Sequence, residues 1–169
     1  GKILSVRVES PVQIAADRWD TNGYDWRAIG RYADAVLIPA PVDPKAWAPG
    51  GQVEALLEWA TGEIQRSKVH LVLPARSVEQ AGRYLLLKSY SEALAPLVGD
   101  VVVRQSVVEP GQPVEVQLQR ERQPTPLTMD QTSGMQTYQY IDLQGYPRTV
   151  WLENATSLSH KLKIISRYS

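Results

Sequence analysis

Residues 35–39 read AVLIP and residues 69–74 read VHLVLP, and these two apolar runs decide the fold class. Each run closes on a proline, and a short continuous apolar run is typical of a strand buried on both faces in a parallel sheet. Residues 51–67 lie between them and carry apolar side chains at helical spacing, which predicts an amphipathic helix. Because strand, helix and strand alternate, we predict parallel crossovers and an α/β fold.

The alternation extends toward the N-terminus. Residues 2–8 alternate in a way that predicts a further buried strand. A loop with an Asn22-Gly23 turn signal follows over residues 9–24. Asp25 is placed to cap a short helix that runs through Arg31. The first part of the chain is therefore predicted to hold three parallel strands.

Residues 77–99 predict a helix, because Ser77 and Gln80 have capping-box spacing and Gly99 is a natural stop. After Gly99 the apolar residues alternate in steps of two between proline and glycine turns, which predicts a small antiparallel sheet. The predicted strands are residues 101–108, 114–118, 137–142 and 148–152, with turns at Pro110-Gly111 and at residues 142–145. Asn154 is then placed to cap a final helix.

Composition excludes several classes of function. The 169 residues include 18 Lys and Arg against 18 Asp and Glu, so the formal net charge is zero, and we expect no nucleic-acid partner. The absence of cysteine excludes disulfides and a cysteine nucleophile. His70 and His160 stand in no metal-ligand spacing, and no phosphate-binding fingerprint is present, so we expect no metal and no cofactor. No apolar run approaches the ~20 residues of a membrane span.

The tail of the chain carries the most specific pattern. It reads Tyr138-Gln139-Tyr140-Ile141-Asp142, a glycine turn at Gly145, Val150-Trp151-Leu152-Glu153, Ser157 and Lys161-Leu162. This pattern resembles the end of the insertion domain in glycoside hydrolase family 18, the chitinase-like family. Upstream, Gly23-Tyr24-Asp25-Trp26 and Ala33-Asp34-Ala35-Val36 resemble the segment leading into that family's sixth barrel strand, and residues 68–74 resemble its seventh.

The resemblance implies a partial (β/α)₈ barrel, about strands five to seven, with an inserted small antiparallel α+β domain. We expect residues 1–99 to be the barrel segment, 100–152 the insertion domain and 153–169 the barrel helix that follows it. Such a segment leaves open strand edges, so we expect either self-association through these edges or helices that cover them. We also expect the chain to be a piece of a longer protein.

The chain departs from the family pattern at the reacting groups. The family's run of aspartates ending in the acid glutamate belongs to the fourth strand, and the chain contains no such run. The family's sixth strand commonly ends Met-x-Tyr-Asp, whereas residues 39–42 here read PAPV, with Asp43 one place late. We therefore assign no catalytic residue and expect the chain by itself to be inactive.

The resemblance implies that the parent protein acts on or binds a polysaccharide containing N-acetylglucosamine, either chitin or peptidoglycan. It also implies an extracellular or cell-wall location. One alternative is a non-catalytic glycan-binding or scaffold domain of a bacterial surface protein. Another is a protein-interaction module that uses the insertion sheet.

Acidic residues in the loops after predicted parallel strands could line a barrel mouth, where the active sites of barrel enzymes lie. They are Asp43, Glu9, Asp17 and Asp20. The competing interpretation is that they are solvated loop acids and caps. Arg76 follows the third strand, and it either faces the same mouth or lies on the surface.

Aromatic residues provide the other candidates for substrate binding. Trp47 and Trp19 lie in loops after strands, where each ring either stacks on a sugar or packs under its loop. Tyr138 and Tyr140 share one face of the predicted hairpin, which either lines the substrate groove or packs on the barrel. Trp26, Trp59 and Trp151 lie on periodic faces and are expected in the core.

Overall fold

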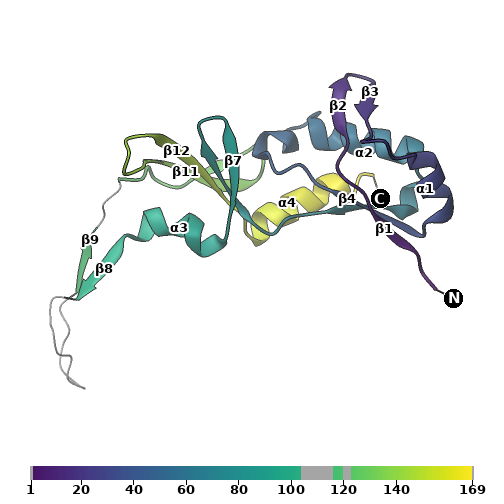
Figure 1. The fold of residues 1–169 in the computed structure, drawn as a ribbon. Helices are drawn as coiled ribbons and strands as arrows, with labels where there is room; N and C mark the ends of the chain where they lie inside the picture. The colour runs from purple at the N-terminus through teal and green to yellow at the C-terminus, as the bar shows by residue number, and fades with distance from the viewer. Residues whose placement is uncertain (1, 104–115, 120–122, 169) are drawn as a thin grey trace. The chain divides into compact units, whose positions relative to one another are not determined.

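The computed structural model describes residues 2–103, 116–119 and 123–168, and its elements are labelled in Figure 1. The chain forms two compact units, which are described separately. Unit 1 comprises Gly1–Ala75, Asp130–Met135 and Asn154–Ser169, and unit 2 comprises Arg76–Met129 and Gln136–Glu153. The predicted domain boundaries after residues 99 and 152 stay predictions.

Unit 1 is built on a parallel sheet of three strands, β1 (Ser5–Arg7), β4 (Ala35–Pro39) and β5 (Val69–Val72), in the order β1-β4-β5. The central strand β4 is the most buried, since Val36 and Ile38 are fully shielded from solvent. The predicted parallel strands and the α/β class are thus confirmed. The described residues form no closed barrel, and barrel membership stays a prediction.

Helices of unit 1 pack around this sheet. In α1 (Trp26–Tyr32) the Asp25 side chain accepts a hydrogen bond from the Ala28 amide, as predicted. In α2 (Gln52–Glu63) the apolar stripe predicted from spacing is buried. In α4 (Ala155–Ile165) Asn154 and Ser157 form a reciprocal capping box. Short 3-10 turns complete the unit at η1 (Pro44–Trp47) and η2 (Arg66–Lys68).

The predicted loop over residues 9–24 contains a hairpin that the sequence pattern does not predict. Its strands are β2 (Val12–Ala15) and β3 (Arg18–Asp20). Its two strands are short and their register shifts between Gln13 and Ala15, so no clean alternation marks them. The predicted turn at Asn22-Gly23 is confirmed, because both residues adopt positive φ, 53° and 79°.

The helix predicted to begin at Ser77 is wrong. Residues 77–81 form β6 (Ser77–Ala81), which turns at Gly82 (φ +58°) into β7 (Tyr84–Lys88). Helix α3 (Tyr90–Val98) begins only afterwards, capped by a reciprocal Ser89–Glu92 capping box. The physical reason is tertiary: β6 pairs with β7 on one side and with a distant strand on the other, and these ladders override a local helical spacing.

Unit 2 is centred on the sheet β10-β11-β12-β6-β7. Its further strands are β10 (Thr128–Asp130), β11 (Met135–Ile141) and β12 (Pro147–Leu152). The predicted hairpin of β11 and β12 is confirmed, with Tyr138 opposite Val150. Buried side chains of α3, β11 and β12 form the core of this unit.

A separate two-stranded antiparallel sheet joins β8 (Asp100–Val103) and β9 (Val116–Gln119). These strands confirm the start of the predicted strand over residues 101–108 and most of the one over 114–118. The predicted Pro110-Gly111 turn lies outside the described residues.

Candidate functional site

Asp43 follows the carboxyl end of β4 and begins the turn η1. Its Oδ1 accepts a hydrogen bond from the Lys45 backbone amide at 2.9 Å, and Pro44 occupies the first position of the turn. The side chain is half-buried. Asp43 therefore caps the turn η1, which is one of the two roles considered for it from the sequence. The cap occupies one of its carboxylate oxygens.

Trp47 ends the same turn and lies in the core of unit 1. Its side chain is 2% exposed and packs in a cluster that includes Val53, Leu57 and Ile164. The Nζ of Lys161, itself buried, lies 5.1 Å from the centroid of the ring. A ring that is enclosed in this way offers no open face to a sugar, so the geometry favours packing for Trp47.

Trp19 belongs to a group of three tryptophans in unit 1. Its half-buried ring stacks on Trp59, with centroids 5.4 Å apart, and Trp59 meets Trp26 edge-on at 4.9 Å. Both spacings are in the range of favourable aromatic pairs. Trp19 therefore packs with Trp59 and, through it, extends the cluster around Trp26. Trp26 is buried, as predicted.

The other predicted loop acids are exposed, namely Glu9, Asp17 and Asp20. Asp20 accepts a hydrogen bond from the Asn22 amide at 3.0 Å, which shapes the turn that precedes α1. Arg76 is exposed at the start of β6, and its Nη2 lies 3.4 Å from the Leu87 carbonyl oxygen. These positions fit the surface alternative that their sequence left open.

Tyr138 and Tyr140 lie in the core of unit 2, 2% and 7% exposed, with ring centroids 6.1 Å apart. The Tyr138 hydroxyl donates to the Ala93 carbonyl oxygen of α3. The Tyr140 hydroxyl donates to Glu79 Oε2 at 3.1 Å. The two tyrosines thus share one face, as predicted, and that face packs on α3 within unit 2 instead of on the barrel segment.

Glu79 belongs to a charged group that joins β6 to the β11–β12 hairpin. Arg148 donates from Nε to Asp142 Oδ2 at 2.8 Å, and its Nη2 lies 2.7 Å from the same oxygen. Its Nη1 lies 3.6 Å from Glu79 Oε1. We call Glu79, Asp142, Arg148 and Tyr140 the hairpin network. No local pattern predicts this network, because Glu79 lies in a segment whose spacing predicts a helix, and only the register of β12 on β6 brings these groups together.

Asp142 also shapes the hairpin turn. Its Oδ1 accepts hydrogen bonds from the backbone amides of Tyr146, at 2.8 Å, and Gln144, at 3.0 Å. The hydrogen bond from the Tyr146 amide is the largest cause that holds the pKa of Asp142 below its ordinary value, and Arg148 adds to it. The turn is therefore built around an ionised carboxylate.

We expect this lowered pKa to make part of the stability dependent on pH. A carboxyl group with a lower pKa in the folded state stabilises the fold above its ordinary pKa of about 4. That contribution is lost as the pH falls through the lowered folded value. Urea unfolding from pH 7 to pH 2 should show less acid destabilisation in Asp142→Asn than in the unmodified chain. A carboxyl carbon of Asp142 that titrates in NMR at or above the ordinary pKa would contradict this.

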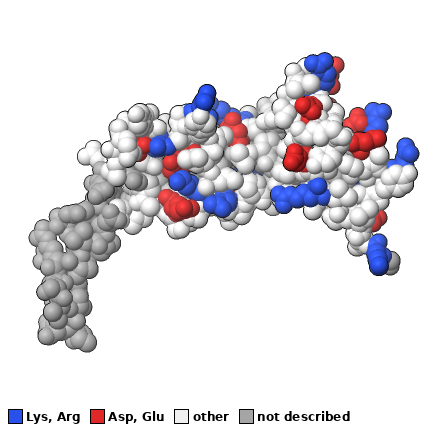
Figure 2. Space-filling model, in the orientation of Figure 1, with Lys and Arg blue, Asp and Glu red and all other residues white. Residues whose placement is uncertain are grey.

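The described residues show neither a metal-binding cluster nor a membrane-spanning helix. Within this part of the chain, no group of three or more His, Asp or Glu side chains is placed to hold a metal ion. No helix in the same residues combines the length and apolar character of a membrane span. On the face shown in Figure 2, described Lys and Arg side chains lie interspersed with Asp and Glu, in line with the zero net charge.

No protein-family model matches the chain. A Bacillus subtilis protein named as a glycosylase, YvbX, is 22% identical over 178 residues, which cover 99% of this chain and 45% of that protein. The solved structure of YdhD from Bacillus subtilis, described as a sporulation-specific glycosylase, matches 99% of this chain with a TM-score of 0.64 and 18% identity. A chitinase from Chromobacterium violaceum matches 98% with a TM-score of 0.61 and 23% identity.

The chain covers 52% of the YdhD chain and 47% of the chitinase chain. It therefore spans about half the length of the relatives that it matches. At these identities the likeness shows the fold. The chain thus has the fold of one part of these glycosylase and chitinase chains.

Proposed function

We propose that the chain is part of a protein resembling glycoside hydrolase family 18, which acts on or binds a polysaccharide containing N-acetylglucosamine. The observation that carries the proposal is the match of nearly the whole chain to glycosylase and chitinase structures. The spore cortex-lytic enzyme SleL of Bacillus megaterium also matches 98% of the chain, with a TM-score of 0.56 and 19% identity. Chitin and peptidoglycan are accordingly the two substrates that we propose.

We further propose that this chain binds glycan without hydrolysing it. The family resemblance places Pro41 and Val42 where a tyrosine and an aspartate commonly stand, and neither side chain can orient an acetamido group or carry a proton. Asp43, the nearest carboxylate along the chain, caps η1 through one of its oxygens. These features favour a glycan-binding or scaffold role and assign no catalytic residue.

The cellular setting follows from the substrate. Chitin and peptidoglycan lie outside the cytoplasm, so we propose an extracellular or cell-wall location. Among the described residues, β1 and β5 are the outer strands of the parallel sheet. Self-association through these edges remains part of the proposal, because an open strand edge presents unpaired backbone groups.

The proposal is tested by measuring binding and hydrolysis on the same preparation. Isothermal titration of the 169-residue chain with N-acetylglucosamine oligomers and with soluble peptidoglycan fragments should detect binding. Cello-oligosaccharides, which lack the acetamido group, serve as the matched control ligand. Incubation with the N-acetylglucosamine oligomers should release no shorter product. Product release would overturn the non-catalytic role, and failure to bind either glycan would overturn glycan recognition by this chain.

A further inference from the structure

A pocket of about 370 Å³ opens within unit 2, and its lining includes Arg148 of the hairpin network. It is lined by residues of the β6–β7 turn and of the start of β12. They are Ala81, Gly82, Tyr84, Tyr146, Pro147 and Arg148. Its volume is in the lower part of the range of small-molecule sites, which fits a mono- or disaccharide.

The pocket exists because a small residue lies between two large ones. Ala81 of β6 is directly opposite Tyr84 on β7 and opposite Arg148 on β12. Residues directly opposite on neighbouring strands project from the same face of a sheet. The methyl group of Ala81 therefore leaves open the space between a tyrosine ring and a guanidinium group.

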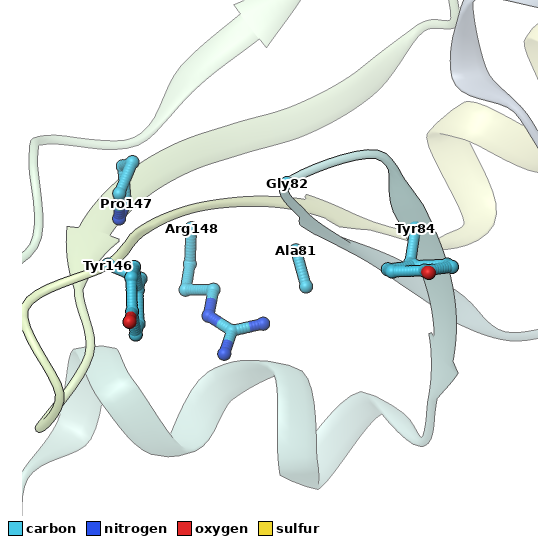
Figure 3. Close-up of a pocket in the computed structure, with 6 residues that line it drawn as sticks. All are labelled: Ala81, Gly82, Tyr84, Tyr146, Pro147 and Arg148. Carbon is cyan, nitrogen blue, oxygen red and sulfur yellow. The ribbon is translucent and has the colours of Figure 1, made fainter.

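Two exposed aromatic rings flank this space. Tyr84 is 58% exposed and Tyr146 is 65% exposed, and Figure 3 shows them on opposite sides of Arg148. Arg83 holds the Tyr84 ring in place, because its guanidinium carbon lies 5.0 Å from the ring centroid and its Nη2 donates to the Tyr84 hydroxyl at 2.8 Å. The Tyr146 backbone is held by its hydrogen bond to Asp142. The Tyr84 ring and the Tyr146 backbone are thus held, while both rings remain open to solvent.

The cationic side chain of the pocket lining already lies beside two carboxylates. The positive charge of Arg148 faces the carboxylates of Asp142 and Glu79, so the pocket offers no uncompensated cation to an anionic ligand. Its Nη1 lies 3.6 Å from Glu79 Oε1, beyond hydrogen-bond distance, and keeps N–H groups that can donate to a ligand. The pocket therefore fits an uncharged ring with apolar faces and an edge of hydroxyl or amide oxygens.

We propose that this pocket is a sugar subsite that binds one end of an N-acetylglucosamine-containing glycan, an inference that rests on the proposed function. A pyranose ring presents apolar C–H faces to the tyrosine rings, and its edge oxygens accept hydrogen bonds from Arg148. The subsite would hold the glycan on unit 2 without taking part in any bond cleavage.

The test compares pocket variants of the full 169-residue chain in titrations with N,N′-diacetylchitobiose. Tyr146→Ala and Tyr84→Ala should each weaken binding about 3- to 10-fold, the range expected for one aromatic contact. Ala81→Leu should weaken it at least about tenfold, because the larger side chain fills the pocket. Tyr32→Ala, which removes a tyrosine of unit 1 that is also largely exposed, is the matched control and should bind as the unmodified chain does.

Circular dichroism and thermal unfolding establish that each variant is folded, and the two tyrosine variants keep the test decisive if Ala81→Leu disturbs the sheet. Binding by the unmodified chain that all three pocket variants retain within about twofold would overturn the subsite and leave the proposed function standing. Absence of any glycan binding by the unmodified chain would overturn the proposed function and the subsite with it.

Discussion

Replacement of Trp47 by alanine is expected to lower the free energy of unfolding by about 3–5 kcal/mol, the range for a large aromatic side chain removed from a core. The side chain is 2% exposed and fills the space between η1, α2 and α4. The variant loses the transfer free energy of the indole and leaves a cavity that these elements can close only in part. Lys161 also loses the ring against which its ammonium group lies. Chemical denaturation followed by far-ultraviolet circular dichroism measures the change.

Tyr32→Ala is the control for this experiment, because Tyr32 is an aromatic residue of the same unit that is 73% exposed. It should change the free energy of unfolding by no more than about 0.5 kcal/mol. The comparison separates the two roles that the sequence left open for Trp47. A loss below about 1 kcal/mol in Trp47→Ala, with loss of sugar binding, would identify a surface platform and contradict the buried role.

Glu79→Ala is expected to lower the free energy of unfolding by about 2–4 kcal/mol. Glu79 is buried in the sheet of unit 2, where it accepts a hydrogen bond from the Tyr140 hydroxyl and faces Arg148. Its removal takes away the carboxylate to which that hydroxyl donates and one of the two carboxylates beside the guanidinium. Breaking a buried pair costs more than the pair contributes, because the remaining groups stay desolvated. Urea unfolding at pH 7 measures the loss.

Two variants bracket this result. Glu79→Gln keeps an oxygen acceptor for Tyr140 but removes the charge, so it should be less destabilising than Glu79→Ala. Glu63→Ala breaks the ion pair in which Arg27 is largely exposed, and it should cost under about 1 kcal/mol. If Glu79→Ala is as mild as Glu63→Ala, the hairpin network does not stabilise unit 2 in the way described.

Local patterns predicted most of unit 1. The apolar run at residues 35–39 is β4, and the helical stripe that includes Val53 and Leu57 is the buried face of α2. Asp25 and Asn154 cap the helices expected of them. These features depend on residues within a few positions of one another, so the sequence contains the information that specifies them.

The largest error concerns the helix predicted over residues 77–99, where β6 and β7 occupy the part before α3, and it has a different origin. Ser77 and Gln80 have the spacing of a capping box, but Ser77 Oγ instead accepts a hydrogen bond from the backbone amide of Glu153 at 3.1 Å. A short apolar segment does not distinguish helix from strand by its spacing alone. The outcome was decided by the β12 ladder, whose residues lie far away in the chain.

The candidate sites divide in the same way. The sequence by itself determined the parallel strands, the caps of α1 and α4, the hairpin of residues 137–152 and the absence of cysteine chemistry, because each follows from composition or from neighbours along the chain. Only the tertiary structure decided that Trp47 and Tyr138 are buried, and that Ala81 leaves a gap between Tyr84 and Arg148. Burial and cross-strand register depend on which distant segments meet, and a one-residue change of register would turn these side chains to the other face of the sheet.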